Sequence, residues 1–464
     1  MFRGLLPSLF LPFLAFAPLH AEGPTRLPNL IFVLADDLGY GDVGCYGQKQ
    51  IRTPNLDRLA AEGMRFTQFY AGSTVCAPSR CCLMTGYHSG HGWIRSNARM
   101  DLRPTDITVA KILKERGYAT GLFGKWGLGT EGGSGQPTRQ GFNEFYGYLD
   151  QNHAHNYYPS FLMRGEKREQ LKNEVPPAKN KNPFGSGVAS RKVEYSHDLI
   201  TAEAFSFIER NKDGPFFLYL AWTIPHANNE AKAATGNGCE VPDLGIYKDK
   251  PWPEAQKSYA AMITYMDRDV GRLRELLRRH GLDQDTLIIF SSDNGPHKEG
   301  GNDPEFFKSG GPLRGIKRDL YEGGIRMPTI ACWPGHTITG TESDYVGAFW
   351  DVLPTFAELA GASDKVPQGI DGISFVPTLL GRANQKKHDE LYWVFYERGG
   401  ARALRAGDWK AVQQPMKAAI EIYDLCNDIG EKDNVAAKHP DIVETMRKRL
   451  DSAFTTTEQW KLPK

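Results

Sequence analysis

The sequence predicts an α/β protein with a large, mostly parallel sheet and a smaller antiparallel sheet near the C-terminus. Uninterrupted apolar runs, typical of strands buried on both faces, recur along most of the chain. Segments with helical periodicity separate these runs, and this alternation favours parallel strand connections. Beyond Gly381 the apolar residues instead alternate with polar ones over short segments, which is typical of an antiparallel sheet.

The elements expected in the larger part alternate in type along the chain. The apolar runs predict strands at residues 30–35, 66–70, 119–123, 216–221 and 287–292. Helical periodicity and terminal signals such as Pro54 and Gly281 predict helices at residues 53–63, 109–116 and 259–280. Together these elements predict a layered domain in which helices cover a wound sheet.

The C-terminal region is expected to form its own small unit. The alternating pattern predicts short strands at residues 391–396, 401–405, 409–412 and 420–423, followed by a helix at 441–454. A chain of 464 residues is long enough for two domains. We place the linker at residues 382–387, which gives a catalytic domain over 22–383 and a C-terminal α+β subdomain over 384–464.

The N-terminal residues predict a secretory signal peptide over residues 1–21. Arg3 precedes an apolar stretch from Leu5 to Leu19, and Ala21 offers a small residue for cleavage. This stretch is shorter than the about 20 residues that span a bilayer, and prolines interrupt it. We therefore expect an exported protein, secreted or periplasmic, with no membrane span in the mature chain.

Charge and cysteine content narrow the classes of partner. The 56 Lys and Arg residues nearly balance the 55 Asp and Glu residues, so no global field favours nucleic acid or an anionic membrane. An anionic substrate would have to be bound by local charges. The seven cysteines are an odd number for an exported chain, which indicates that one thiol has a fate other than a disulfide.

The most informative segment is Cys76-Ala77-Pro78-Ser79-Arg80-Cys81-Cys82-Leu83-Met84-Thr85-Gly86. The Pro-Ser-Arg after the first cysteine predicts the first turn of a helix, a setting that lowers a thiol pKa and offers amides to an anion. The segment resembles the maturation motif of the type I sulfatases, C-x-P-S-R followed by L-[LM]-T-G. The resemblance implies an alkaline-phosphatase-like fold and a maturation enzyme that oxidises Cys76 to formylglycine. In that family the hydrated aldehyde attacks the sulfur of a sulfate ester.

Polar residues follow two of the predicted strands. Asp36 and Asp37 come directly after residues 30–35, and Asp293 and Asn294 come after 287–292. The carboxyl ends of strands in such a sheet carry functional residues and can meet at one edge. Because carboxylate and amide oxygens favour a hard cation, the pattern predicts calcium or magnesium rather than zinc. The family resemblance implies one calcium ion at these positions.

Four further residues are expected to surround the sulfate group. A transition state that builds charge on sulfate oxygens needs fixed cations. Arg80 lies in the maturation motif, and Lys125 ends a segment that resembles the family pattern G-Y-x-T-x-x-x-G-K-W. Lys317 precedes a second family pattern, Glu322-Gly323-Gly324-Ile325-Arg326-Met327-Pro328. His226 matches the family histidine at the bridging oxygen and is expected to protonate the leaving group.

The chain departs from the family pattern at two positions. The family usually has G-K-W-H, with a histidine that helps to re-form the aldehyde, whereas this chain has Gly127 at that place. Water or a histidine from a loop would have to take its part. The maturation motif usually ends T-G-R, and here Tyr87 replaces the arginine.

Residues 148–159 combine aromatic and hydrogen-bonding side chains, which predicts a loop that contacts a glycan. The loop looks like that of sulfatases acting on galactose or N-acetylgalactosamine units, with His153 and His155 as tentative substrate residues. His297, which follows Asp293 and Asn294, is a third tentative substrate residue, expected to project towards the same site. The leading prediction is a calcium-dependent sulfatase acting on a sulfated carbohydrate. Two alternatives stay open: a phosphodiesterase or phosphonate hydrolase of the same superfamily, and an inactive glycan-binding relative.

Overall fold

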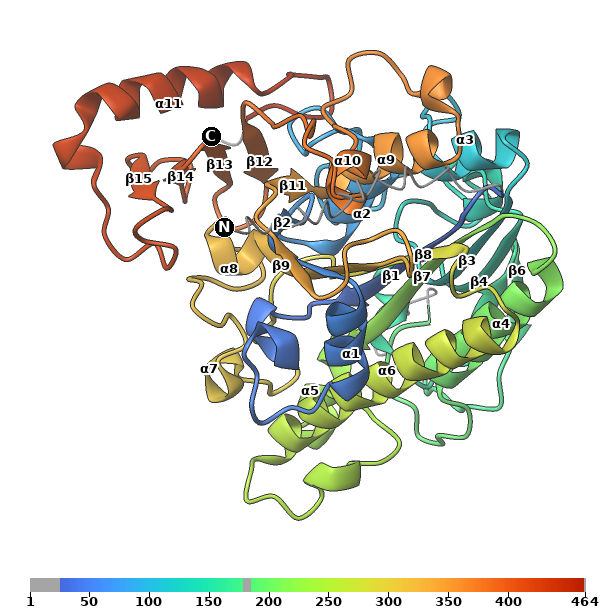
Figure 1. Cartoon of the computed structure of the whole chain (residues 1–464). Coiled ribbons are helices and arrows are strands. Elements are labelled where there is room, and N and C mark those ends of the chain that lie inside the picture. Colours follow the sequence, from blue (N-terminus) through green and yellow to red (C-terminus); the bar gives the residue numbers. More distant parts are fainter. Residues whose placement is uncertain (1–25, 178–184, 463–464) are drawn as a thin grey trace, which may run out of the picture.

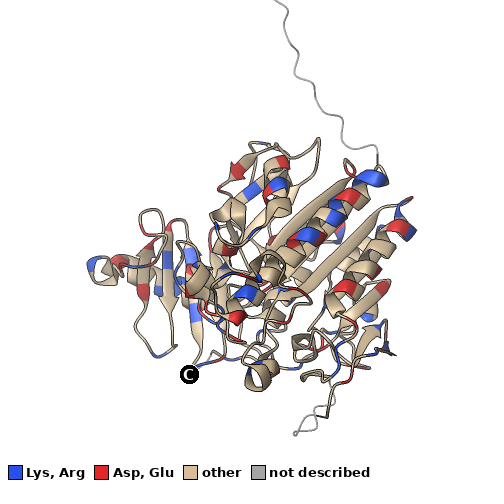
Figure 2. Cartoon of the chain, turned by 90° about the horizontal axis from the view of Figure 1, so that it is seen from below, with Lys and Arg blue, Asp and Glu red and all other residues tan. Residues whose placement is uncertain are grey.

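The computed structural model describes residues 26–177 and 185–462. The predicted signal peptide, residues 1–21, lies outside the described residues. Among the described residues, no helix is both long and apolar enough for a bilayer crossing. Basic and acidic residues are mixed over the helices and strands of Figure 2, as the balanced composition leads one to expect.

The larger part of the molecule is built on a mixed sheet of eleven strands in the described chain, shown in Figure 1. Ten of these strands follow the order β10-β2-β9-β8-β1-β7-β3-β4-β5-β6, and β11 pairs with β2. Their bounds are β1 Asn29–Asp36, β2 Met64–Tyr70, β3 Ala119–Lys125, β4 Glu144–Tyr148, β5 Phe161–Arg164, β6 Lys167–Gln170, β7 Phe216–Pro225, β8 Thr286–Ser292, β9 Arg326–Cys332, β10 Thr341–Ser343 and β11 Gly347–Ala348.

The centre of this sheet is parallel. Strands β8, β1, β7, β3 and β4 run in one direction, whereas β9, β5 and β6 are antiparallel to their neighbours. The expected α/β class with a mostly parallel sheet is therefore confirmed. The sequence did not predict β9, because its third residue is Pro328, which is unusual inside a strand.

Helices cover both faces of the large sheet (Figure 1). Successive residues of β1 point to opposite faces, so Ile31 and Val33 enter one apolar core while Leu30 and Phe32 enter the other. The first core includes α1 (Pro54–Glu62), α4 (Ser196–Asn211) and α6 (Glu254–Arg279). The second includes α2 (Cys76–Thr85), α3 (Val109–Glu115) and α9 (Val352–Leu359). The shorter helices are α5 Asn229–Thr235, α7 Pro304–Phe307, α8 Glu322–Ile325 and α10 Val376–Leu379.

The C-terminal region forms the expected antiparallel sheet with one helix packed on it. Strand order is β12-β13-β14-β15, and their bounds are Leu391–Phe395, Ala401–Ala406, Trp409–Gln413 and Glu421–Asp424. Helix α11 (Pro440–Ser452) covers one face, where Met446 and Leu450 join the core of this sheet. The other face packs against the larger part through Trp393, whose indole NH donates to Ala71. The domain limit at 383/384 remains a prediction.

Candidate active site

The polar residues that follow β1 and β8 lie side by side. The two strands are parallel neighbours, with Ala35 paired to Ser292, so both chains leave the sheet at the same edge. The amide of Asp37 donates to Oδ1 of Asp293 over 3.2 Å, and Nδ2 of Asn294 donates to Oδ1 of Asp37 over 2.7 Å. Asp36, Asp37, Asp293 and Asn294 are all buried. The structure thus brings the four predicted metal ligands into one cluster.

Cys76 begins helix α2 directly beside this cluster. Its thiol donates to Oδ1 of Asp36 over 3.4 Å. Ligand atoms of Cys76, Asp36, Asp37 and His226 all lie within 4.8 Å of one another. The expectation that the start of a helix lowers the thiol pKa is wrong, because burial and then the charge of Asp36 raise the pKa of Cys76. The free thiol is therefore poorly suited to act as a thiolate nucleophile.

Arg80 and Lys125 hold the carboxylates from one side. The Nε and Nη2 groups of Arg80 donate to Oδ2 of Asp293 over 3.0 and 2.7 Å. Nζ of Lys125, from the end of β3, donates to Oδ2 of Asp36 over 2.6 Å. Nη1 of Arg80 also donates to the backbone carbonyl of Lys125 over 2.7 Å, which ties the two cations together.

Lys317 and His226 close the opposite side. Nζ of Lys317 donates to Oδ2 of Asp37 over 2.8 Å and lies 3.0 Å from Nε2 of His226. Nδ1 of His226 faces the carbonyl of Ala227 at 2.7 Å, so it must be the donor there. Nε2 of a neutral His226 then accepts from Lys317. Burial and the charge of Lys317 lower the pKa of His226 to about 3, which agrees with the neutral form.

The carboxyl groups differ in the direction of their pKa shifts. Burial alone would raise the pKa of both Asp36 and Asp37, but Lys125 and Lys317 respectively contribute most to a net lowering. Burial and the charge of Asp36 instead raise the pKa of Asp293 to about 7, although Arg80 opposes them. A site that crowds carboxylates in this way favours a cation among them.

Two observations fit a hard divalent ion at this cluster. Oδ1 of Asn294 is buried and accepts no hydrogen bond from any described residue, so an acceptor is present without a protein donor. Asp37 has a φ of 65°, a left-handed conformation that is uncommon for residues other than glycine and that concentrates at functional sites. The carboxylate and amide oxygens match calcium or magnesium, whereas zinc would favour nitrogen and sulfur donors.

The three tentative substrate histidines occupy different places. His155 stacks on His226, with ring centroids 4.9 Å apart, and His297 stacks on the same residue at 5.9 Å. Both therefore line the catalytic side of the site. His153 packs against Tyr148 and Phe161 and contacts none of the residues around Cys76 in the described chain.

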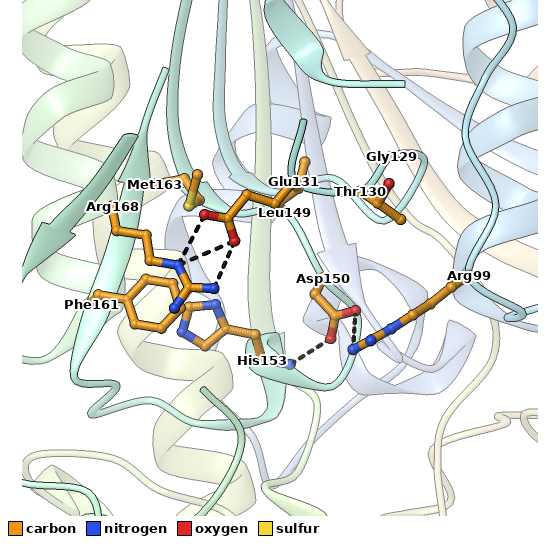
Figure 3. A pocket seen from close by; sticks show the side chains of 10 residues that line it. All are labelled: Arg99, Gly129, Thr130, Glu131, Leu149, Asp150, His153, Phe161, Met163 and Arg168. Carbon is orange, nitrogen blue, oxygen red and sulfur yellow. Dashed lines mark hydrogen bonds and ion pairs between the residues drawn. The ribbon is translucent and has the colours of Figure 1, made fainter. Parts of the chain in front are cut away.

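His153 lines a separate pocket, shown in Figure 3. Ion pairs hold two sides of this pocket, from Arg99 to Asp150 over 2.7 Å and from Arg168 to Glu131 over 2.6 Å. The backbone NH of His153 donates to Asp150 over 3.1 Å, which fixes the start of the loop. The histidine ring therefore packs on aromatic rings in a pocket that charged side chains also line.

Sequence reasoning missed Glu299, which lies on the Lys317 side of the site. Its Oε2 is 3.4 Å from Nζ of Lys317 and 3.8 Å from Nε2 of His226, and Arg318 pairs with its other oxygen. Burial would raise the pKa of Glu299, but the charges of Lys317 and Arg318 hold it well below the ordinary value. No local pattern marks this residue; only its position two residues after His297 could have drawn attention to it.

Comparisons with known proteins agree with the geometry. A family model described as Sulfatase matches residues 28–362, and one described as N-sulphoglucosamine sulphohydrolase, C-terminal, matches residues 316–456. Arylsulfatase A from Homo sapiens is 33% identical over 93% of this chain and 89% of its own length. N-acetylgalactosamine-6-O-sulfatase from Bacteroides thetaiotaomicron is 29% identical over 93% of this chain and 94% of its own length. The crystal structure of Ps i-CgsB in complex with k-i-k-neocarrahexaose is 28% identical and matches with a TM-score of 0.79 over 95% of each chain.

Proposed function

The chain belongs to the sulfatase family and hydrolyses sulfate esters, and we propose that its substrate is a sulfated carbohydrate of the galactose or N-acetylgalactosamine type. The observation that carries the catalytic part is the position of Cys76. It begins α2 within 4.8 Å of Asp36, Asp37 and His226, between Lys125 and Lys317. The sulfatase family generally uses calcium and formylglycine, and the proposal includes both for this chain.

Conversion of Cys76 to formylglycine explains why a buried thiol of raised pKa occupies the centre of the site. One oxygen of the hydrated aldehyde would attack sulfur and displace the ester oxygen, which leaves with a proton as the alcohol. Loss of the proton of the second hydroxyl would then break the carbon–oxygen bond to sulfate and restore the aldehyde. In this proposal Asp36, Asp37, Asp293 and Asn294 hold one calcium ion. When bound, that ion supplies positive charge against the sulfate oxygens.

The other residues of the chain position charge and protons around the ester. Lys125 and Lys317 face the nucleophile from two sides and offset the charge that develops on sulfate. Arg80 orients Asp293 and fixes the end of β3. Nζ of Lys317 holds a proton against Nε2 of His226, so this pair can deliver a proton to the leaving oxygen.

Two lines of support favour a carbohydrate. His155 and His297 both stack on His226, the residue expected at the leaving oxygen, so the loops that carry them adjoin the site. Relatives of similar length are named for N-acetylgalactosamine-6-O-sulfatase activity or were solved with a carrageenan-type oligosaccharide. A site built to bind hydroxyl groups discriminates strongly against analogues that lack them.

A matched pair of substrates tests the carbohydrate. Protein made with the maturation enzyme, and shown by peptide mass to carry formylglycine at position 76, would be assayed with 6-O-sulfated galactose or N-acetylgalactosamine and with cyclohexylmethyl sulfate. Both types carry sulfate on a primary carbon, but the latter lacks ring hydroxyls. We expect kcat/KM to be at least about 100-fold higher for one of the sugars. Equal turnover of all the substrates would contradict a carbohydrate site.

The phosphodiesterase alternative needs its own comparison. The same preparation would be assayed with an aryl sulfate and an aryl phosphodiester, and we expect faster release of the phenol from the sulfate. A higher kcat/KM for the phosphodiester would favour the alternative. Unmodified cysteine at position 76 together with sugar binding would favour the inactive glycan-binding relative.

Export is also part of the proposal. The apolar stretch from Leu5 to Leu19 and the small residue Ala21 support a cleaved signal peptide. A mature N-terminus at residue 22, measured by mass in secreted or periplasmic material, is the expected result. An intact N-terminus in the cytoplasmic fraction would contradict it.

A further inference from the structure

The side chain of Gln151 lies at the position of the absent family histidine. Gly127 has a φ of 77°, a conformation that residues with a side chain rarely adopt. A Cβ atom built on Gly127 would lie 1.8 Å from Nε2 of Gln151. A histidine at 127 would therefore need a strained backbone and a displaced Gln151 side chain, whose amide occupies the space here.

The amide of Gln151 has no partner in the described chain. Both Oε1 and Nε2 are buried, and neither makes a hydrogen bond to a described residue. Burying an amide without partners costs about 1–3 kcal/mol by mutational measures. An unpaired donor and an unpaired acceptor on one side chain indicate a ligand that supplies an acceptor and a donor.

The surroundings of Gln151 connect it to the nucleophile. Backbone hydrogen bonds from Trp126 to Tyr148 and from Gly127 to Leu149 hold its loop against the end of β3. Gln151 and Gly127 line a small hollow together with Asn97. Oδ1 of Asn97 accepts from the amide of Ala77, the residue after Cys76, over 2.9 Å. The hollow thus adjoins the first turn of α2.

We propose that Gln151 is a substrate-contacting residue of the sulfatase site, which takes the space of the absent histidine. Its Nε2 donates to an oxygen of the sulfate group, and its Oε1 accepts from a hydroxyl of the hydrated residue 76. Because a primary amide does not titrate near neutral pH, Gln151 supplies hydrogen bonds there without acting as a base. This inference rests on the proposed function, since it requires a sulfate ester at Cys76.

The test compares variants that carry formylglycine by peptide mass. Gln151→Ala is expected to lower kcat/KM for an aryl sulfate by about 100-fold, as loss of one transition-state donor does. The inhibition constant of inorganic sulfate is expected to rise by about tenfold, because the variant loses the amide that donates to a sulfate oxygen. The melting temperature is expected to stay equal or rise, because the variant removes an unpaired buried amide. A purely structural side chain would instead lower the melting temperature.

Two further variants make the result decisive. Gln170→Ala removes an exposed glutamine on β6 and is expected to keep activity within about twofold. Gln151→Glu keeps the shape but places a carboxylate against sulfate, so activity is expected to fall at least as far as in Gln151→Ala. Activity within threefold of the parent in folded, converted Gln151→Ala would overturn the inference; if that variant does not fold, Gln151→Glu decides by the same limit. A converted parent enzyme that releases no sulfate would overturn the proposed function instead.

Discussion

The molecule contains two buried clusters, each of which holds both acidic and basic side chains, and the two serve different purposes. The catalytic cluster consists of Asp36, Asp37, Arg80, Lys125, His226, Asp293, Asn294 and Lys317. The interface cluster lies between the large sheet and the C-terminal sheet and consists of Tyr70, Glu322, Arg326, Arg405, Lys410 and Glu431. Both are almost fully buried. They differ in what surrounds their charges.

The interface cluster is organised around one lysine. Nζ of Lys410, from β14, lies 2.8 Å from an oxygen of both Glu322 and Glu431. The second oxygen of Glu322 accepts from Tyr70 over 2.6 Å and from Arg326 over 3.2 Å. Burial would raise the pKa of Glu322, but Lys410 and Arg326 outweigh it and lower the pKa to about 2. The charges of this cluster find their partners within the chain.

The catalytic cluster instead gathers three aspartates and an amide at one edge of the sheet. The amide oxygen of Asn294 has no donor in the described chain, Asp37 has a left-handed backbone, and the pKa of Asp293 is raised to about 7. Such strain is stable only when the surrounding fold imposes it. The comparison teaches that burial, charge pairing and backbone strain do not by themselves mark a functional site, because Glu431 of the interface cluster also has a left-handed backbone, with a φ of 50°. The catalytic cluster differs in that the polar ends of two neighbouring strands gather beside Cys76.

The largest expected effect separates activity from stability at the nucleophile. Cys76→Ala removes the residue that is converted and is expected to lower sulfate release by a factor on the order of 10⁴ or more. The melting temperature is expected to change little, because the hydrogen bond that the thiol makes within the described chain, to Asp36, is long at 3.4 Å. Cys81→Ala, another buried cysteine of α2, is the matched control and should retain activity. Sulfate release by Cys76→Ala near the parental rate would exclude the proposed nucleophile.

A change at the interface cluster is expected to lower stability and leave activity unchanged. Lys410→Met leaves Glu322 and Glu431 without their shared partner, which should lower the free energy of unfolding by about 3–5 kcal/mol. Sulfate release per folded molecule should be unchanged. Denaturant unfolding measures the free energy of unfolding, and an assay at low temperature, where the variant is still folded, measures sulfate release. Lys417→Met, the same change at an exposed residue, should have little effect on either; equal stability of the two variants would break the comparison.

Metal removal should act on the catalytic cluster alone. Free calcium at about 100 times its dissociation constant stabilises the folded chain by about 2.7 kcal/mol, so excess chelator should lower the melting temperature and abolish activity together. Asp293→Asn should reduce both the calcium-dependent rise in melting temperature and the activity. Asp408→Asn, at an exposed turn, should leave them intact. Full activity in strong chelator would contradict the metal assignment.

The sequence predicted the elements of both regions better than their contacts. Apolar runs located β1, β7 and β8 because a strand buried on both faces needs continuous apolar residues. The polar residues at the ends of β1 and β8 could be identified because they directly follow these apolar runs. The Lys410–Glu322 pair joins residues 88 positions apart, and the Gln151–Gly127 contact depends on how β3 and β4 are paired. Contacts of this kind depend on tertiary packing and leave no local pattern.

The smallest expected effect concerns another contact between the larger part of the molecule and the C-terminal region. His388, which precedes β12, lies 2.8 Å from Asp351, just before α9. Burial would lower the pKa of His388, but Asp351, with Asp371 and Asp389, outweighs it and raises the pKa. The protonated ring therefore stabilises the folded chain fully below about pH 6.5, and this contribution is lost as pH rises through the raised pKa.

Replacing this histidine should flatten the pH dependence of stability. Between pH 6 and pH 8 the parent is expected to lose about 1 kcal/mol more than His388→Gln, the usual net value of one hydrogen bond. Melting temperatures across that range measure the difference. His439→Gln, a half-buried histidine that contacts Trp409, should keep the parental slope. If His388→Gln kept that slope as well, the pH response of the interface would have to arise within the interface cluster, where the pKa of Glu431 is raised to about 7 by burial and, against Lys410, by Glu322.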